Sequence, residues 1–244
     1  MTRAILGAAA IAALLSTGAL AMDVPDYVSK AVADETRPKD DRDADALRDP
    51  ADTLTFASVK PGMTVGELYP CGGYFSRLLS DVVGPKGKVA GTDNLGWNGC
   101  TEATQKAVGD RANYSLASEP FGVFKLPQKV DLFWITQNYH DLHIKKYGDV
   151  DMARFNQAVF DSLKTGGTYF ILDHAANPGT SEDDIAKLHR IEKAQVIREV
   201  TAAGFKFVGE GTFLERPGDD HTKPIFDPQV RGKTDQYALK FVKP

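Results

Sequence analysis

Residues 65–93, VGELYPCGGYFSRLLSDVVGPKGKVAGTD, decide the fold of this chain. The segment begins with a short apolar strand and turns at a glycine pair, Gly72 and Gly73. Apolar residues then recur at helical spacing over residues 74–83, and a second short strand ends at Asp93. Strand, glycine turn, helix and strand in this order predict the first unit of an open α/β sheet that holds a nucleotide-type cofactor.

Two acids in this segment stand where such a cofactor needs them. Glu67 lies near the end of the first strand, and Asp93 lies 20 residues beyond Gly73. At that offset an acid after the second strand accepts hydrogen bonds from the two ribose hydroxyls. The predicted cofactor-binding residues are Glu67, Tyr69, Cys71, Gly72, Gly73 and Asp93. A tight turn without a ligand is the alternative, since many turns between strand and helix carry glycine.

The segment resembles the first motif of class I S-adenosylmethionine (SAM)-dependent methyltransferases, which runs acid-x-Gly-x-Gly-x-Gly. Glu67 matches the leading acid and Gly73 the last glycine, whereas Tyr69 and Cys71 stand at the first two glycine positions. A G-x-G-x-x-G dinucleotide fingerprint fits less well, because residues 71–76 lack its first and third glycines. The resemblance implies SAM as the cofactor and a methyl acceptor that the sequence does not identify.

The rest of the chain continues the alternation of strands and helices. Further strands are predicted near residues 113–116, 130–136, 168–173, 205–213 and 237–242, and helices near residues 101–108, 152–163 and 183–203. The last two strands follow each other without a helix, which predicts an antiparallel hairpin at the sheet edge. The predicted fold is therefore α/β, a Rossmann-like, doubly wound, mostly parallel seven-stranded sheet with a C-terminal antiparallel hairpin. That ending is typical of the methyltransferase family, and the resemblance covers about residues 55–244.

Four short phrases carry a closer resemblance. The chain is similar there to a group of exported bacterial proteins described as predicted methyltransferases. The phrases are Tyr139-His140-Asp141-Leu142-His143, Asp173-His174-Ala175-Ala176, Leu188-His189-Arg190 and Arg231-Gly232-Lys233-Thr234-Asp235.

The N-terminus predicts export. After Arg3 the chain carries no charge up to Met22, and Ala19-Leu20-Ala21 forms a small-x-small cleavage pattern. We expect a signal peptide over residues 1–21, cleaved after Ala21, and a periplasmic or secreted protein. The strongly apolar run is shorter than the roughly 20 residues that span a bilayer, so an uncleaved anchor is the weaker alternative. Residues 22–60 are predicted to form an N-terminal helical appendage, and residues 61–244 the Rossmann domain.

Charge and compartment limit the partners. The chain has a net charge of −4, which argues against nucleic acid as the main partner. A small-molecule or unknown methyl acceptor is expected, and the oligomeric state stays open. SAM is made in the cytosol, so an exported enzyme needs its cofactor delivered. A non-catalytic or repurposed methyltransferase-fold binding protein is therefore the second interpretation.

The two cysteines, Cys71 and Cys100, both follow predicted strands. In an oxidising compartment they could pair, and a bridge would brace or obstruct the ribose site. Without a bridge, Cys71 would be a small apolar filler of the turn.

Polar residues after the fourth strand are the predicted catalytic residues, because ligands sit beyond the carboxyl ends of the strands. His140 is expected to take a proton from the acceptor, since an imidazole titrates near neutral pH. Asp141 would orient His140 or bind substrate, and Tyr139 would line the methyl-transfer channel. The alternative is that His140 and Asp141 cap the following helix.

A metal site is the remaining alternative. His140, His143, Asp173, His174, His189 and the loop Asp219-Asp220-His221 have suitable side chains. No H-E-x-x-H or similar spacing is present, so no residue is assigned to a metal. A metal-dependent periplasmic protein using these loops is the third interpretation. His189 and Arg190 are expected within the predicted helix 183–203, with Arg190 in a surface ion pair.

Overall fold

The computed structural model describes residues 22–244. The predicted signal peptide, residues 1–21, lies outside the described residues. Within residues 22–244, no helix is both long and apolar enough to cross a bilayer.

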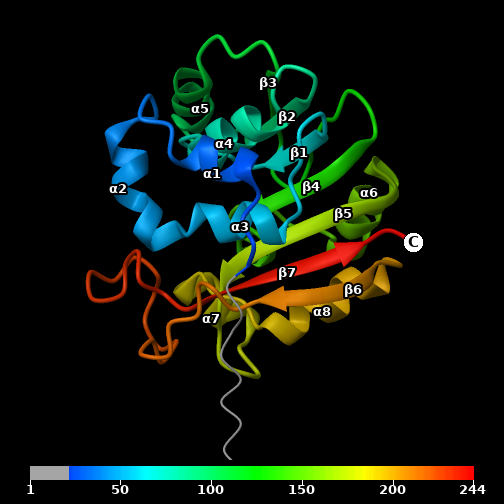
Figure 1. The fold of residues 1–244 in the computed structure, drawn as a ribbon. Helices are drawn as coiled ribbons and strands as arrows, with labels where there is room; N and C mark the ends of the chain where they lie inside the picture. The colour runs from blue at the N-terminus through cyan, green and yellow to red at the C-terminus, as the bar shows by residue number, and fades with distance from the viewer. Residues whose placement is uncertain (1–21) are drawn as a thin grey trace, which may run out of the picture.

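A seven-stranded sheet forms the centre of the molecule (Figure 1). Its strands are β1 (Thr64–Leu68), β2 (Lys88–Asn94), β3 (Tyr114–Glu119), β4 (Val130–Thr136), β5 (Leu163–His174), β6 (Lys206–Gly211) and β7 (Gln236–Val242). The strand order is β3-β2-β1-β4-β5-β7-β6. Strands β1 to β5 are parallel, and β7 pairs antiparallel with both β5 and β6. The predicted mostly parallel sheet and its antiparallel ending are confirmed.

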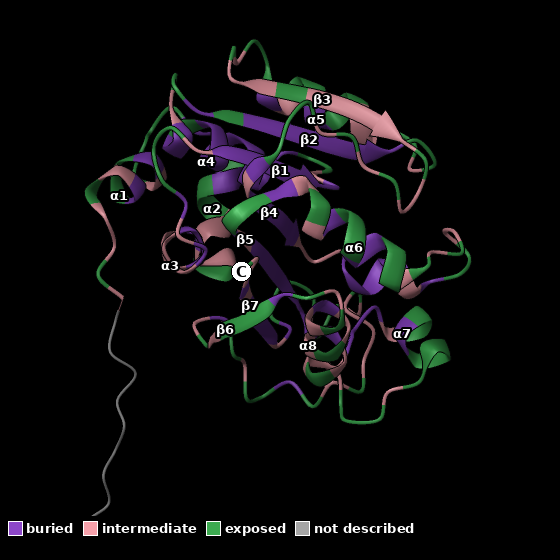
Figure 2. Ribbon diagram, turned by 90° about the vertical axis from the view of Figure 1, so that its right-hand side faces the viewer, coloured by how far each residue is buried: buried purple, intermediate pink, exposed green. Residues whose placement is uncertain are grey.

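Helices cover both faces of this sheet. They are α4 (Tyr74–Val83), α5 (Cys100–Val108), α6 (Met152–Ser162), α7 (Glu182–Leu188) and α8 (Lys193–Ala202), with the short 3-10 helix η1 (His140–His143) after β4. Successive side chains of a strand point to opposite faces. Phe133 and Trp134 of β4 accordingly belong to different core clusters, and both are buried. Figure 2 shows the central strands buried between the helices, as expected for a parallel sheet.

The predicted appendage consists of three short helices, α1 (Asp26–Val32), α2 (Lys39–Arg48) and α3 (Pro50–Phe56). Val28 and Leu54 are fully buried in the same core cluster as the apolar face of α4. Arg77 of α4 also donates two hydrogen bonds to the carboxylate of Asp41 in α2, both of 2.6 Å. The appendage is therefore anchored to the sheet by apolar packing and by a largely buried ion pair.

The predicted single helix over residues 183–203 is wrong. Helix α7 ends at Leu188, the next residue His189 has a left-handed backbone with φ 54°, and α8 begins only at Lys193. Between them Ile191 pairs with Ala175 beside β5. Arg190 is fully buried and pairs with Asp219 at 2.8 Å, so the expected surface ion pair is also wrong. This break directs His189 toward the carboxyl end of the sheet.

We expect the Asp41→Ala substitution to lower the free energy of unfolding by about 3 kcal/mol, because it leaves the Arg77 guanidinium buried without its charge partner. Denaturant unfolding of both proteins measures the difference. Asp43→Ala is the matched control on the same helix, because the exposed Asp43–Lys39 pair should contribute less than about 0.5 kcal/mol. Equal effects of the two substitutions would contradict the anchoring role of the Asp41–Arg77 pair.

Candidate functional site

A cavity of about 440 Å³ lies at the carboxyl ends of β1 and β4. The strand order reverses between β1 and β4. Strands β2 and β3 lie beyond β1 on one side, whereas β5 lies beyond β4 on the other. Open α/β sheets bind their ligands at such a switch point. The turn after β1 forms one wall, and the segments after β4 and β5 form another. Arg48 of α2 and Phe226 of the long loop before β7 also line the cavity.

Three lining residues have a backbone conformation that side chains rarely adopt. Tyr69 has φ 52°, Gln137 has φ 60° and His189 has φ 54°. Each stands at the end of its element: β1, β4 or α7. Positive φ at residues other than glycine costs free energy and occurs often at functional sites. Their coincidence at one cavity supports a ligand site.

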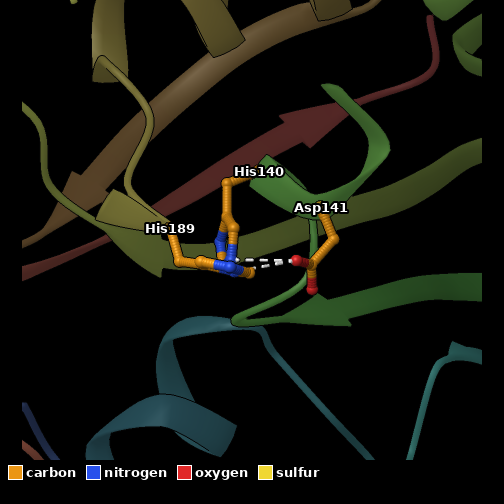
Figure 3. Close-up of side chains that lie close together, drawn as sticks. All are labelled: His140, Asp141 and His189. Carbon is orange, nitrogen blue, oxygen red and sulfur yellow. Dashed lines mark hydrogen bonds and ion pairs between the residues drawn. The ribbon is translucent and has the colours of Figure 1, made fainter. Parts of the chain in front are cut away.

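His140, Asp141 and His189 converge at this cavity (Figure 3). His140 Nε2 lies 3.3 Å from Asp141 Oδ1, and His189 Nδ1 lies 3.2 Å from the same oxygen. The two histidines come from η1 and from the end of α7, which contact each other. The cluster therefore depends on the break between α7 and α8.

A fully buried carboxylate orients this cluster. Asp173 Oδ1, at the end of β5, lies 2.7 Å from His140 Nδ1. The same carboxylate accepts hydrogen bonds from the backbone N–H groups of His140 and His174. Asn138 donates to Asp141 Oδ2 at 3.0 Å, which holds the second carboxylate in place.

These carboxylates change the pKa of His140. Burial lowers the pKa, but Asp173 and Asp141 outweigh burial and raise it to about 10. His140 is then protonated at neutral pH, so its predicted role as a proton acceptor is not supported. Burial raises the pKa of Asp141, but His140 outweighs burial and holds that pKa well below its usual range. Burial lowers the pKa of His174 to about 3, so this cavity-lining imidazole is neutral.

Tyr139 lies away from the cavity, although a position in the methyl-transfer channel was predicted. Its side chain is fully buried in the core. Its hydroxyl donates to Glu199 Oε2 and accepts from Asn156 Nδ2, both at 2.8 Å. His143 also contacts Glu199, at 3.1 Å. The structure therefore places His140 and Asp141 at the cavity, and Tyr139 and His143 behind it.

The predicted cofactor residues separate in the same way. Glu67, Tyr69 and Cys71 line the cavity, whereas Gly72, Gly73 and Asp93 are not among its lining residues. At Gly73, with φ 69°, a Cβ would lie 2.7 Å from the side chain of Ala107. That glycine therefore serves the close packing of the turn on α5.

Asp93 is fully buried, and neither carboxylate oxygen has a hydrogen-bond partner within residues 22–244. Burial raises its pKa, an effect that the nearby Thr104 hydroxyl and Cys71 backbone N–H partly offset. Cys71 and Cys100 form a disulfide, with their Cα atoms 4.7 Å apart. Asp93 thus lies beneath the turn at Cys71 and the start of α5, which this bridge joins.

Aromatic rings fill the space beside this turn. The Tyr69 ring stacks on Phe121 with centroids 5.6 Å apart and contacts Trp97 at 4.9 Å. The Tyr69 hydroxyl accepts the backbone N–H of Gly122 at 2.7 Å. Arg48, Trp97 and Phe226 were not predicted as site residues, because no local pattern indicates that three segments so distant in sequence meet.

Glu67 generates a pH prediction. Burial, only partly offset by the nearby Ser76 hydroxyl and a hydrogen bond from Tyr114, raises its pKa from 4.5 to about 7. Between these values the folded chain holds a proton that the unfolded chain has released, so stability falls as pH rises. We expect the free energy of unfolding to lose roughly 2 to 4 kcal/mol from this group between about pH 4 and pH 8.

The Glu67→Gln substitution should remove that loss, which urea unfolding at several pH values measures against wild type. Glu102→Gln, on the exposed side of α5, is the matched control and should keep the wild-type pH dependence. A Glu67→Gln protein with the wild-type pH dependence would show that the Glu67 carboxyl is not the responsible group.

Comparison with known protein families and with curated proteins finds no match. Comparison with solved structures finds methyltransferases. The chain is similar to a SAM-dependent methyltransferase from Aquifex aeolicus, with 17% identity, 85% of this chain and 100% of that chain covered, and a TM-score of 0.57. A SAM-dependent methyltransferase from Mesorhizobium loti has 14% identity, with 82% of this chain and 97% of that chain covered, and a TM-score of 0.55. Fibrillarin from Aeropyrum pernix, solved with natively bound SAM, has 17% identity, with 82% of this chain and 76% of that chain covered, and a TM-score of 0.53. The chain therefore has the fold of the class I SAM-dependent methyltransferases.

Proposed function

We propose that the protein is a SAM-dependent methyltransferase that acts on a small-molecule acceptor. The observation that carries the proposal is the cavity between β1 and β4. The turn predicted to hold the cofactor forms one wall, and polar side chains after β4 and β5 form the other. One cavity can thus bring a methyl donor and an acceptor together. The fold shared with SAM-dependent enzymes supports the same function.

The side of the cavity formed by the turn after β1 fits SAM, on the condition that the disulfide bridge opens before Asp93 can contact the cofactor. Asp93 is a buried carboxylate at the end of β2, and within residues 22–244 the nearby Thr104 hydroxyl and Cys71 N–H make no hydrogen bond to it. Two ribose hydroxyls would supply such bonds. The Cys71–Cys100 bridge joins the two segments next to it. Glu67 and the Tyr69–Cys71 turn would hold the cofactor in the bridged form, and Asp93 would join them when the bridge opens.

On the acceptor side, the chain's own residues position the substrate. Bound SAM supplies a methyl group on a sulfonium, and transfer then depends mainly on the alignment of the acceptor atom. Arg48, Asn138 and Gln137 present polar groups to the cavity. His140 is already protonated at neutral pH, and the pKa of His174 is lowered to about 3, so neither imidazole is a good proton acceptor and the proposed transfer rests on positioning. The Nδ1 atom of His174 lies 2.8 Å from the Thr234 hydroxyl, which fixes the orientation of the ring.

Export forms part of the proposal. The disulfide supports it, because such bridges persist in oxidising compartments and are rare in the cytosol. The competing interpretation, a non-catalytic binding protein on the same fold, predicts no methyl transfer and no dependence of SAM affinity on the bridge.

We expect SAM to bind the Cys71→Ser/Cys100→Ser double variant about 10- to 100-fold more tightly than the oxidised wild type. This gain corresponds to one net hydrogen bond to the charged Asp93, which contributes roughly 1.5 to 3 kcal/mol. Calorimetric titration of untagged protein spanning residues 22–244 with SAM and S-adenosylhomocysteine measures both affinities. The wild type is titrated before and after reduction.

Asp93→Asn in the double-serine background is the control, since it should abolish the gain without restoring the bridge. Equal affinity in all forms would refute the role of Asp93 but keep the cofactor. Absence of saturable binding in every form would refute the methyltransferase proposal. Gly73→Asp is unsuitable as a probe, because any side chain there meets Ala107.

A further inference from the structure

The acceptor side of the cavity holds a set of side chains that the proposed methyl transfer does not need. Two histidines and one carboxylate, His140, Asp141 and His189, converge on one point (Figure 3). One ligand-type atom of each lies within 4.8 Å of those of the other two. Two imidazole nitrogens and one carboxylate oxygen are a ligand set of catalytic zinc and non-haem iron sites.

The spacing of the three ligand atoms suits an ion with tetrahedral coordination. Two ligands bound at 2.0 to 2.1 Å and separated by the tetrahedral angle lie about 3.3 to 3.4 Å apart. The distances from Asp141 Oδ1 to His140 Nε2 and His189 Nδ1 are 3.3 and 3.2 Å. The ligand atoms of the two histidines lie within 4.8 Å of each other, so closing to the tetrahedral separation takes at most roughly 1.5 Å of side-chain movement.

The surroundings of the cluster also match a metal centre. A metal-bound histidine usually contacts a carboxylate or carbonyl through its other ring nitrogen, which selects the tautomer and orients the ring. The buried Asp173 does this for His140 Nδ1, so that Nε2 faces Asp141. Asn138 restrains the Asp141 oxygen that is not in the set.

The remaining coordination position opens to the cavity. All three side chains line it, together with the neutral His174. A site with three protein ligands and one open position is typical of catalytic zinc, whereas structural zinc sites have four protein ligands.

We propose that His140 Nε2, Asp141 Oδ1 and His189 Nδ1 bind a divalent transition-metal ion of the zinc class. An oxygen of a small molecule takes the open position. The site stands on these residues and does not depend on SAM. If the proposed methyl transfer also holds, the ion binds the acceptor oxygen beside the donor, and this last step rests on the proposed function.

Without a metal ion, protonated His140 forms an ion-pair cluster with Asp141 and Asp173, and metal binding would displace its Nε2 proton to solvent. The competing account is that this ion-pair cluster is the only state of the site. Both accounts use the same contacts, but only one predicts a bound ion. Metal binding is therefore the measurement that separates them.

The experiment titrates untagged, chelator-treated protein with Zn²⁺ by calorimetry and with Co²⁺ by visible absorption. We expect one ion per chain and the visible bands of four- or five-coordinate cobalt. We also expect the thermal midpoint to rise with metal concentration, because an ion that binds the folded chain stabilises it. Absence of stoichiometric binding by wild-type protein, or bands of hexaaqua-like cobalt only, would overturn the proposal.

His189→Asn is the test variant, because asparagine tolerates the left-handed backbone at this position. It should weaken metal binding at least about tenfold. His143→Asn is the matched control, since His143 lies on the same 3-10 helix but contacts Glu199 and not the cluster. It should bind metal like the wild type. Undiminished binding by the His189→Asn protein would show that the ion is elsewhere and would overturn the assignment.

These readouts do not involve SAM or methyl transfer. Metal binding without SAM binding would support the metal site and refute the methyltransferase proposal. SAM binding without metal binding would refute the metal site and leave the methyltransferase proposal intact.

Discussion

The Asp173 carboxylate holds the candidate site together. It stands at the end of β5, is fully buried, and contacts three nitrogens: the backbone N–H groups of His140 and His174 and the ring Nδ1 of His140. A buried carboxylate is costly unless such partners compensate it, so the loop after β4 is drawn against β5. That position sets the direction of His140, which in turn faces Asp141 and His189.

The Cys71–Cys100 bridge constrains the opposite wall. It ties the turn after β1 to the start of α5 and thereby keeps the segments around Asp93 together. Asp93 is buried there, and neither of its carboxylate oxygens has a hydrogen-bond partner within residues 22–244. The proposed dependence of SAM affinity on the bridge follows from this arrangement. An oxidising compartment, which favours the bridge, is also one to which SAM must be delivered.

The sheet was predictable because its signals are local. Glycine turns, apolar strands and helical periods repeat along the chain, and the absence of a helix between the last two strands predicted their antiparallel pairing. The break at His189 was not predictable, because apolar Leu188, Ile191 and Val196 continue a helical pattern through it. Tertiary contacts decide there: Ile191 pairs beside β5, and Arg190 finds its partner in the distant residue Asp219.

The distinction between local sequence signals and tertiary contacts also explains the wrong predictions at the site. His140 and Asp141 were found because they follow a strand, but neutral pKa behaviour was assigned to His140 without knowledge of the Asp173 carboxylate. Tyr139 follows the same strand, yet the positive φ of Gln137 changes the direction of the chain, and the tyrosine enters the core. Sequence position thus predicts which loops meet, and only the structure shows which side chains face the cavity.

The two walls of the cavity differ in how far they follow the methyltransferase pattern. On the donor side, Tyr69 and Cys71 stand where the methyltransferase motif has glycines. Their side chains make the aromatic stack and the disulfide bridge beside the turn after β1. On the acceptor side, the histidines and carboxylates form a supported, cavity-facing cluster. Backbone strain at Gln137 and His189 is retained there, and strain persists only where the surrounding structure enforces it. The physical chemistry of this chain is therefore most specialised on the wall that the segments after β4 and β5 form, where the proposed acceptor would lie.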